Sequence, residues 1–259
     1  PGGNIIDRLD KLELPVEIRG KMEELFVQKY PDVVAKHNLD VGQCSDLLGA
    51  VSIQLKDGEQ FPRNKKVYAL SNEDQAHLDD ILMCMEKYGL IRASKNLDLN
   101  QGFGSSCYMI GRKNNHGRII VDFSQINPLL HSPPENIPDL HLSINFLQKF
   151  GLVSSMDLKN AYYSIELKEE SKWLSSFITK KGIWEFERLP TGMAISPSIY
   201  SDYVMKVFHY EVQYNDKNEI LYDKDGKAVL KFKPCPFIIN YFDDIIVRSD
   251  FATSYSEML

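Results

Sequence analysis

The chain has 259 residues, of which 43% are hydrophobic and 25% charged, with a formal net charge of −6 and a pI near 5.6. This length allows a sizeable core in one large domain or two small ones, and no apolar run is long enough to cross a membrane. The acidic balance argues against nucleic-acid binding through a global basic field, and the scattered cysteines and histidines argue against a zinc site or a disulfide framework and favour a reducing compartment.

Two helices are predicted in the first third of the chain. The first covers residues 15–30 and ends at Pro31. The second begins at Ser71, where Ser71 and Asp74 resemble a capping box, and ends at Gly89. Their apolar faces are Ile18, Met22, Leu25 and Phe26 in the first helix and Leu78, Ile81, Leu82 and Met85 in the second. Between them we expect loops and a short strand or two.

The middle and end of the chain predict strands in pairs, with helices between them. The expected hairpins join 108–110 to 118–121, 177–179 to 183–186, and 219–222 to 228–232. Short helices are expected over 139–150 and 159–164, and a longer one over 196–210. The apolar face of the longer helix is predicted as Ile199, Tyr203, Val207 and Tyr210. This interleaving favours an α+β fold with an antiparallel sheet.

Three aspartates stand beside short apolar strands. Asp157 ends the run 152–158, and Asp243 and Asp244 lie at the expected turn of a hairpin over 237–247. An Asp-Asp pair between strands is also typical of a solvated turn. The third carboxylate, in a similar setting, indicates a site for hard divalent cations if the two strands are neighbours.

Four ordered segments resemble the motifs of reverse transcriptases from retroviruses and LTR retrotransposons. They are the fingers run at 108–127 with Val121-Asp122-Phe123, SSMDLKNAYYSIEL at 154–167, LPTGMAISPSIY at 189–200 and YFDDIIV at 241–247. The lead-in at 30–34 and 70–94 is similar to that of gypsy-class retrotransposons. The motifs occur in the order and at the spacing of that family.

The resemblance implies an α+β fold of the right-hand polymerase type. An N-terminal helix and lead-in would cover 1–55, the fingers 56–131 and 165–201, and the palm 132–164 and 202–259. The palm sheet would be antiparallel and packed on helices. We expect no thumb within the chain, because it ends soon after the YFDD motif.

The same resemblance implies an RNA-directed DNA polymerase that extends a primer 3′-hydroxyl with deoxynucleotides. Two Mg²⁺ ions about 3.5–4 Å apart, or Mn²⁺ in their place, would activate the attacking oxygen and stabilise the leaving pyrophosphate. By resemblance, Asp157, Asp243 and Asp244 are the catalytic residues and the metal ligands, and the backbone carbonyl of Leu158 is a further oxygen ligand.

The resemblance also implies a set of nucleotide contacts. Arg112 and Arg118 would clamp the triphosphate, and Asn160 and Ala161 would offer it backbone N–H groups. Tyr162 matches the aromatic residue that excludes a 2′-hydroxyl, although a core aromatic is the alternative. Thr191 and Gly192 lie in the loop that would contact nucleotide and template. Thr191 departs from the Gln of retroviral enzymes and the aromatic residue of gypsy-class enzymes.

The implied partners are an RNA or DNA template with its primer, deoxynucleotides, and the thumb, connection and RNase H of the same polyprotein, with no membrane. The expected location is the cytoplasm, in a virus-like particle or replication complex, or the nucleus. The oligomeric state is not predicted.

Two alternatives stay open at this point. One is a domesticated reverse-transcriptase-like domain that acts as a binding or scaffold module, which the acidic charge and the extra segment 211–234 favour. The other is an RNA-dependent RNA polymerase, against which Tyr162 argues.

Overall fold

The computed structural model describes residues 15–33, 35–37, 39–43, 45–59, 67–95, 104–110, 118–131, 152–158, 160–241 and 244–249. The chain divides into two compact units. Unit 1 comprises Pro1–Gly42, Asn136–Ala161 and Ser201–Leu259, and unit 2 comprises Gln43–Glu135 and Tyr162–Tyr200. Within the described ranges, no helix has both the length and the apolarity needed to cross a membrane.

The predicted N-terminal helix is confirmed, with a change of pitch. Helix α2 (Val16–Glu23) continues directly into a π-helical segment, η1 (Glu24–Lys29), and ends at Tyr30, one residue before Pro31. None of its residues is buried. The residues of its predicted apolar face, Ile18, Met22, Leu25 and Phe26, are half-buried.

Unit 2 is built on a five-stranded sheet with the strand order β1-β6-β5-β2-β3. The strands are β1 (Ile91–Ala93), β2 (Ser105–Ile110), β3 (Arg118–Asp122), β5 (Phe177–Thr179) and β6 (Gly182–Phe186). The two predicted hairpins, β2–β3 and β5–β6, are confirmed as antiparallel pairs. The hairpins join through a short parallel pairing of β2 with β5, which the sequence did not predict.

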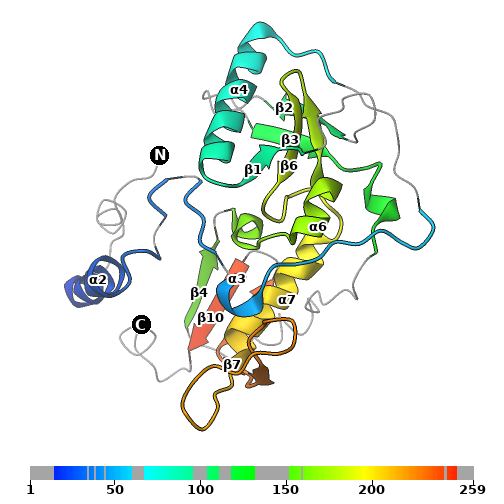
Figure 1. Cartoon of the computed structure of the whole chain (residues 1–259). Helices are drawn as coiled ribbons and strands as arrows, with labels where there is room; N and C mark the ends of the chain where they lie inside the picture. The colour runs from blue at the N-terminus through cyan, green and yellow to red at the C-terminus, as the bar shows by residue number, and fades with distance from the viewer. Residues whose placement is uncertain are drawn as a thin grey trace. The chain divides into compact units, whose positions relative to one another are not determined.

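Helix α4 (Asn72–Lys87) lies alongside this sheet, as Figure 1 shows. It begins as predicted, because the Ser71 hydroxyl accepts a hydrogen bond from the Asp74 amide at 3.1 Å. Its buried residues are Leu78, Leu82 and Met85, and Gly89 follows its end with a φ of +65°. The cap, the apolar stripe and the glycine stop thus agree with one another.

Short helices complete unit 2. They are α3 (Ser45–Leu48), η2 (Asn127–Leu129), η3 (Ala161–Ser164), α6 (Glu169–Lys172) and η4 (Trp173–Ser175). Isolated bridges pair Val51 with Leu167 and Leu55 with Leu130, so the predicted loop region contributes short extended segments to the unit. The helical turn predicted over 159–164 is confirmed by η3, although Lys159 lies outside the described residues.

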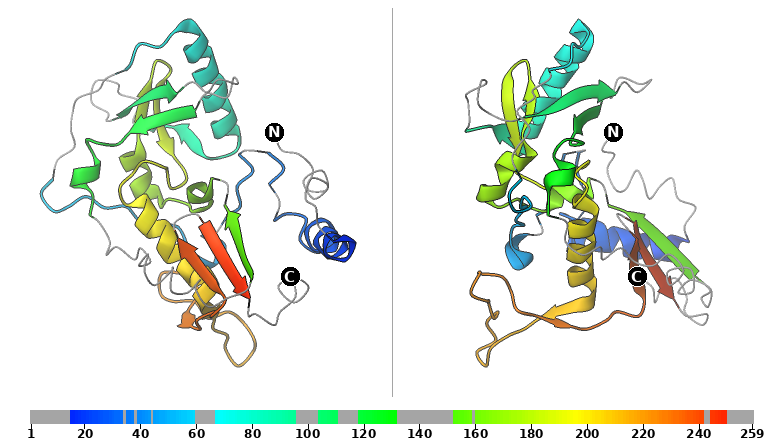
Figure 2. Two further views of the ribbon diagram at one scale, coloured as in Figure 1. Left: turned by 180° about the vertical axis from the view of Figure 1, so that it is seen from behind. Right: turned by 90° about the vertical axis from the view of Figure 1, so that its right-hand side faces the viewer.

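Unit 1 contains a three-stranded antiparallel sheet with the order β4-β10-β9. Its strands are β4 (Leu152–Asp157), β9 (Ile238–Tyr241) and β10 (Asp244–Ser249), and both views in Figure 2 show them beside the later part of helix α7 (Ser196–His209). The Asn240 amide contacts the Ser201 hydroxyl of α7 at 3.4 Å. The predicted hairpin over 237–247 is therefore confirmed, with Asp244 as the first residue of β10 and not a turn residue.

The predicted apolar face of α7 is only partly right. Tyr203 and Val204 are each 5% exposed, whereas Val207 is 55% exposed. Tyr210 has already left the helix, because its backbone pairs with Phe232 and its ring contacts that of Phe232 at 5.2 Å. The last turn of α7 therefore extends beyond the elements that cover Tyr203.

An extended hairpin, residues 210–232, follows α7 and confirms the predicted hairpin in part, because residues 221–222 pair with 228–229, whereas residues 230–232 pair with 210–212. Strand β7 (Tyr210–Val212) pairs with β8 (Leu230–Phe232), and further bridges join Tyr214 to Ile220 and Tyr222 to Ala228. The Asp223 carboxylate accepts backbone hydrogen bonds from Asp225 and Lys227, which closes the outer turn. We refer to it as the 210–232 hairpin.

Some predicted features lie outside the described residues. They are the loop 111–117 with Arg112, the proline-rich run from residue 132 onward, the helix over 139–150, and Asp243.

His209 directly precedes the 210–232 hairpin and contacts Cys235, which follows it. This histidine should make the stability of unit 1 sensitive to acid. Its Nδ1 accepts a hydrogen bond from the Cys235 amide at 3.0 Å, and burial lowers the pKa of its imidazole. Because the folded state favours the neutral ring, the free energy of unfolding should be fully retained above the ordinary pKa of about 6.5 and should fall as pH drops below it.

The check is chemical denaturation at pH 7.5 and 5.5, for the wild type and for His209→Asn, whose amide oxygen keeps an acceptor that does not titrate. The variant should lose less stability on acidification than the wild type. An equal loss in both proteins would exclude His209 as the source.

Candidate functional site

Two of the three predicted carboxylates stand on directly opposed positions of neighbouring strands. In the β4–β10 ladder Asp244 pairs with Asp157, and in the β9–β10 ladder it pairs with Tyr241. Residues opposed in this way have Cα atoms about 4.5–5.5 Å apart. Asp243, in the two-residue connection between β9 and β10, lies outside the described residues. Positions 157 and 244, far apart in the chain, thus meet at one end of the sheet.

The burial of Ile245 on β10 sets the face of the sheet on which Asp244 stands. Ile245 is 4% exposed and Asn240 is 1% exposed, and the two are paired across the strands. Asp244, the next residue along, is exposed. A slip of one residue would bury Asp244 and expose Ile245, so burial of the apolar face fixes the position of the carboxylate.

The residue types at this strand end suit a hard divalent cation. Carboxylate and backbone carbonyl oxygens are the ligands that Mg²⁺ and Mn²⁺ prefer, and Leu158, directly after Asp157, is 40% exposed. Among the described side chains there is no group of three metal-ligating residues. Asp243 and the side chain of Asp157 are not among the described side chains. The fit therefore depends on the strand register and on the donor chemistry.

The segment after Asp157 turns sharply into η3. Asn160 has a φ of +51°, a left-handed conformation that asparagine adopts more readily than most residues, and Ala161 is buried. Tyr162 is half-buried, with its ring 5.1 Å from that of the buried Tyr200. Tyr162 is therefore partly a packing residue and partly a surface residue, which agrees with either of the roles considered for it.

Tyr163, which the sequence analysis did not select, connects two of the predicted nucleotide contacts. Its ring stacks on Phe186 with centroids 6.1 Å apart. Burial raises the pKa of the Tyr163 phenol, while a hydrogen bond with Thr191 and the charge of Arg118 act to lower the pKa. The structure thus joins Tyr163 to Thr191 of the loop 189–193 and places Arg118 of β3 within electrostatic range of the same tyrosine. The only sequence signal was a second tyrosine in the AYY run.

Asn127 holds the loop that carries Thr191 and Gly192. Its side-chain amide donates to the Gly192 carbonyl at 3.2 Å and accepts from the Ala194 amide at 2.9 Å. Gly192 has a φ of +95°, and Ser196 donates to the Pro190 carbonyl at 2.6 Å. The loop is therefore fixed by side chains on both sides, with Thr191 exposed at its tip. The position of the last predicted contact, Arg112, is not described.

Comparison with solved structures identifies the class of fold. The foamy virus protease–reverse transcriptase aligns with 98% of this chain and 30% of its own length, with a TM-score of 0.72 and 17% identity. A structure of a foamy viral protease–reverse transcriptase in complex with an RNA/DNA hybrid aligns with 97% of this chain and 30% of its own length, with a TM-score of 0.68 and 16% identity. The chain has the α+β fingers-and-palm fold of reverse transcriptases.

The sequence places the chain in a family. The profile described as "Reverse transcriptase (RNA-dependent DNA polymerase)" matches residues 111–259, which is more than half of the chain. The chain belongs to the reverse transcriptase family.

The curated relatives are polyproteins, and those from transposons are retrovirus-related Pol polyproteins. The one from the Drosophila melanogaster transposon opus is 25% identical over 219 residues, 81% of this chain and 19% of the polyprotein. That of transposon 297, also from Drosophila melanogaster, is 26% identical over 203 residues, 76% of this chain and 16% of the polyprotein. The enzymatic polyprotein of Figwort mosaic virus is 24% identical over 247 residues, 95% of this chain and 33% of the polyprotein. The chain spans no more than a third of these relatives.

Gly192 should be intolerant of a side chain for a reason internal to the backbone. An added Cβ would meet Phe123 and the Val121 carbonyl at 3.5 Å, which is ordinary contact, but its φ of +95° is strained for any other residue. Gly192→Ala should lower the free energy of unfolding by about 1–2 kcal/mol, measured in urea.

Gly20→Ala in helix α2, where nothing lies within 4 Å of the added Cβ, is the matched control. It should stabilise the protein by about 0.5–1 kcal/mol. A Gly192→Ala variant as stable as the wild type would show that the loop readily changes its conformation.

Proposed function

We propose that the chain supplies the fingers and palm of an RNA-directed DNA polymerase from a gypsy-class LTR retrotransposon or a retrovirus-like Pol polyprotein. Its reaction is the extension of a primer 3′-hydroxyl with deoxynucleotides. The observation that carries the proposal is the β4–β10 register, which sets Asp157 opposite Asp244 in a chain of the reverse transcriptase family.

In this proposal unit 2 is the fingers, over 56–131 and 165–201, and unit 1 contains the palm, over 132–164 and 202–259. The division of the chain after Glu135, Ala161 and Tyr200 supports these boundaries. The three-stranded antiparallel sheet supports the assignment of unit 1, because it carries the opposed aspartates.

Asp157, Asp243, Asp244 and the Leu158 carbonyl would hold two Mg²⁺ ions, or Mn²⁺. Such ions, when bound, make the primer hydroxyl more acidic and neutralise charge on the triphosphate. The protein's own contribution is placement, because opposed positions in a hydrogen-bonded ladder keep the carboxylates at a fixed spacing throughout the reaction.

The remaining residues would bind and orient the nucleotide. Arg118, with Arg112, would balance the charge of the triphosphate, and the amides of Asn160 and Ala161 would donate to it. Thr191 and Gly192 would contact nucleotide and template from a loop that Asn127 already holds in place. Such preorganisation matters in phosphoryl transfer, since catalysis there is mostly positioning and charge stabilisation.

The partners in this proposal are deoxynucleotides, an RNA or DNA template with its primer, and a thumb, connection and RNase H of the same polyprotein. Two solved foamy virus structures are complexes with an RNA/DNA hybrid or with double-stranded DNA, which supports the template and primer as partners. The proposed location is the cytoplasm, in a virus-like particle or replication complex, or the nucleus. A thumb should be needed for full activity, because phosphate contacts supply much of the affinity for nucleic acid.

Primer extension tests the chemistry. The chain, and a version extended by the sequence that follows in its reading frame, should add deoxynucleotides to a primer on RNA and DNA templates with Mg²⁺. Asp157→Asn and Asp243→Asn should each reduce the rate about a thousandfold or more, because each removes charge worth several kcal/mol in the transition state.

Asp216→Asn, the same substitution at an exposed turn of the 210–232 hairpin, is the control and should leave the rate unchanged. Wild-type activity that persists in Asp243→Asn would contradict the proposed mechanism.

Tyr162 should discriminate against ribonucleotides through its ring. Tyr162→Ala should raise the relative efficiency of ribonucleotide incorporation about 10–100-fold, since it opens space beside the sugar, whereas Tyr162→Phe should preserve discrimination. The measurement is kcat/KM for one nucleotide in its ribo and deoxy forms. Equal discrimination in the Ala variant would leave Tyr162 as a core aromatic packed on Tyr200.

A second function, that of a domesticated binding or scaffold module, is favoured by one observation. The 210–232 hairpin exposes three aromatic side chains to more than half of their surface, namely Tyr214, Tyr222 and Phe232. The same primer-extension assay separates the two functions. A folded wild-type protein that extends no primer with Mg²⁺ or Mn²⁺, in either length, would favour the binding module.

A further inference from the structure

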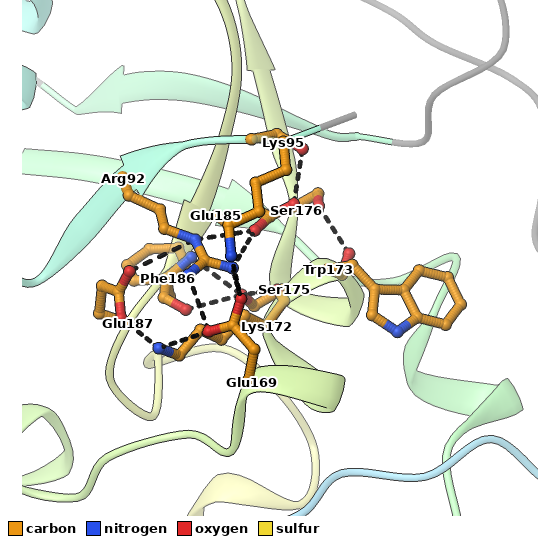
Figure 3. Close-up of polar contacts among 11 residues, drawn as sticks. Arg92, Lys95, Glu169, Lys172, Trp173, Ser175, Ser176, Glu185, Phe186 and Glu187 are labelled. Carbon is orange, nitrogen blue, oxygen red and sulfur yellow. Dashed lines mark hydrogen bonds and ion pairs between the residues drawn. The ribbon is translucent and has the colours of Figure 1, made fainter. Parts of the chain in front are cut away.

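Unit 2 contains a cluster of charged side chains outside the proposed site, which Figure 3 shows between β1, α6 and β6. Its three cations and three carboxylates are Arg92, Lys95, Glu169, Lys172, Glu185 and Glu187. We call it the Lys172 cluster. The side chains of Lys172 and Glu185 are only 8% and 4% exposed, which is rare for these residue types unless they are paired.

Every buried charge in the cluster has opposite charges beside it. Arg92 donates to both oxygens of Glu169 at 2.9 Å and to Glu185 at 3.0 Å. The Lys172 ammonium contacts Glu187, and it contacts Glu169 at 3.2 Å. Burial acts to lower the pKa of Lys172, but the hydrogen bonds to the two carboxylates outweigh it and leave the pKa raised. Lys172 therefore stays charged at neutral pH.

Stability alone does not explain such a cluster. Replacing a buried ion pair with apolar residues of similar volume is often neutral or stabilising, because the charges lose their hydration. Ion pairs do restrict geometry, since each requires a partner at a defined place. The question is then which segment of the chain the Lys172 cluster holds in place.

Glu187 links the cluster to both segments that carry proposed nucleotide contacts. Its backbone carbonyl accepts from the Leu167 amide at 2.9 Å, and two residues further on the Leu189 amide donates to the Ile165 carbonyl at 2.8 Å. The Ile165 amide in turn donates to the Tyr162 carbonyl at 3.1 Å. These backbone hydrogen bonds thus connect segment 186–189 to Tyr162 and directly precede the loop that carries Thr191. All of these residues belong to unit 2.

Ser175 strengthens the connection from the α6 side. Its hydroxyl accepts from the Phe186 amide at 2.9 Å and donates to the Lys172 carbonyl at 2.6 Å. The segment 186–189 is thus held by the backbone near Lys172 as well as by the charge of its side chain. The Ser175–Phe186 hydrogen bond and the Lys172–Glu187 ion pair both hold residues that come immediately before the loop that carries Thr191.

We propose that Lys172 is a positioning residue for the nucleotide site. Its buried ammonium holds Glu187 and Glu169 together, which keeps segment 186–189 paired with 165–167 and so fixes the relative placement of Tyr162, Tyr163 and Thr191. The inference rests on the proposed polymerase function for its consequence, but the placement itself is a property of unit 2 that is measured without activity.

Hydrogen exchange of the full chain measures the placement. In Lys172→Met, which keeps the length of the side chain and removes the charge, the amides of Leu167 and Leu189 should exchange about tenfold faster than in the wild type. The amides of the β2–β3 ladder should keep their wild-type rates. Lys172→Arg should restore protection, because it restores the charge.

Primer extension measures the consequence. Lys172→Met should raise the KM for deoxynucleotides about tenfold with kcat within about twofold of the wild type, and Lys172→Arg should reverse the change. A role in stability alone would reduce the amount of active enzyme and leave KM unchanged. Lys206→Met, which removes a surface pair with Asp202 at 2.5 Å, is the matched control and should alter neither KM nor exchange at Leu167 and Leu189.

The outcomes are distinguishable. Wild-type exchange at Leu167 and Leu189 in folded Lys172→Met would overturn the positioning role, whatever the activity. An absence of primer extension by the wild type would contradict the proposed function and leave exchange to decide the placement. If circular dichroism shows that Lys172→Met is unfolded, Glu187→Gln removes the partner charge from a more exposed side chain and is judged by the same rates.

Discussion

The structure depends above all on the pairing of β4 with β10. This ladder joins residues 152–157 to residues 244–249, so it closes a long loop of chain and brings Asp157 opposite Asp244. On β10 the buried Ile245 follows the exposed Asp244, and across the β9–β10 ladder Ile245 pairs with the buried Asn240. A shift by one residue would place a carboxylate among apolar side chains without a partner, at a cost of several kcal/mol. Burial of Ile245 therefore determines the face of the sheet on which Asp244 stands.

The sequence predicted the features that a local pattern controls. The helix after Ser71 has a cap, an apolar stripe and a glycine stop that agree, and each confirmed hairpin has apolar runs on either side of a polar turn. What it could not predict are contacts between residues distant in the chain. Asn127 forms hydrogen bonds with Gly192 and Ala194, and Tyr163 forms a hydrogen bond with Thr191, and no periodicity in the sequence predicts either. The end of α7 was missed for a similar reason, because Tyr210 leaves the helix to pair with Phe232.

The Lys172 cluster shows a second limit of sequence reasoning. The stretch Lys168–Lys172 has the composition of a solvated helix face, yet Lys172 is buried and Glu169, although exposed, contacts three cations. These cations lower the pKa of the Glu169 carboxyl, with Arg92 first among them. Because folding favours the charged form of Glu169, the carboxylate contributes to the free energy of unfolding above its ordinary pKa, and this contribution is lost as pH falls. Whether a charged side chain is buried depends on its partners in the tertiary structure. One partner of Lys172 is Glu187, which follows the β5–β6 hairpin in the sequence.

An acidic chain is poorly suited to a polyanionic substrate, and this bears on the proposed reaction. With a net charge of −6, the chain has no global field that would attract nucleic acid. Aspartates grouped at a strand end would repel a triphosphate further, unless divalent cations are the largest charges in the site and invert its sign. In the proposed function, the acidic strand end would bind phosphate through metal ions, and the exposed Arg118 would bind phosphate directly. Affinity for the nucleotide should accordingly depend on divalent cations far more than on the overall charge of the protein.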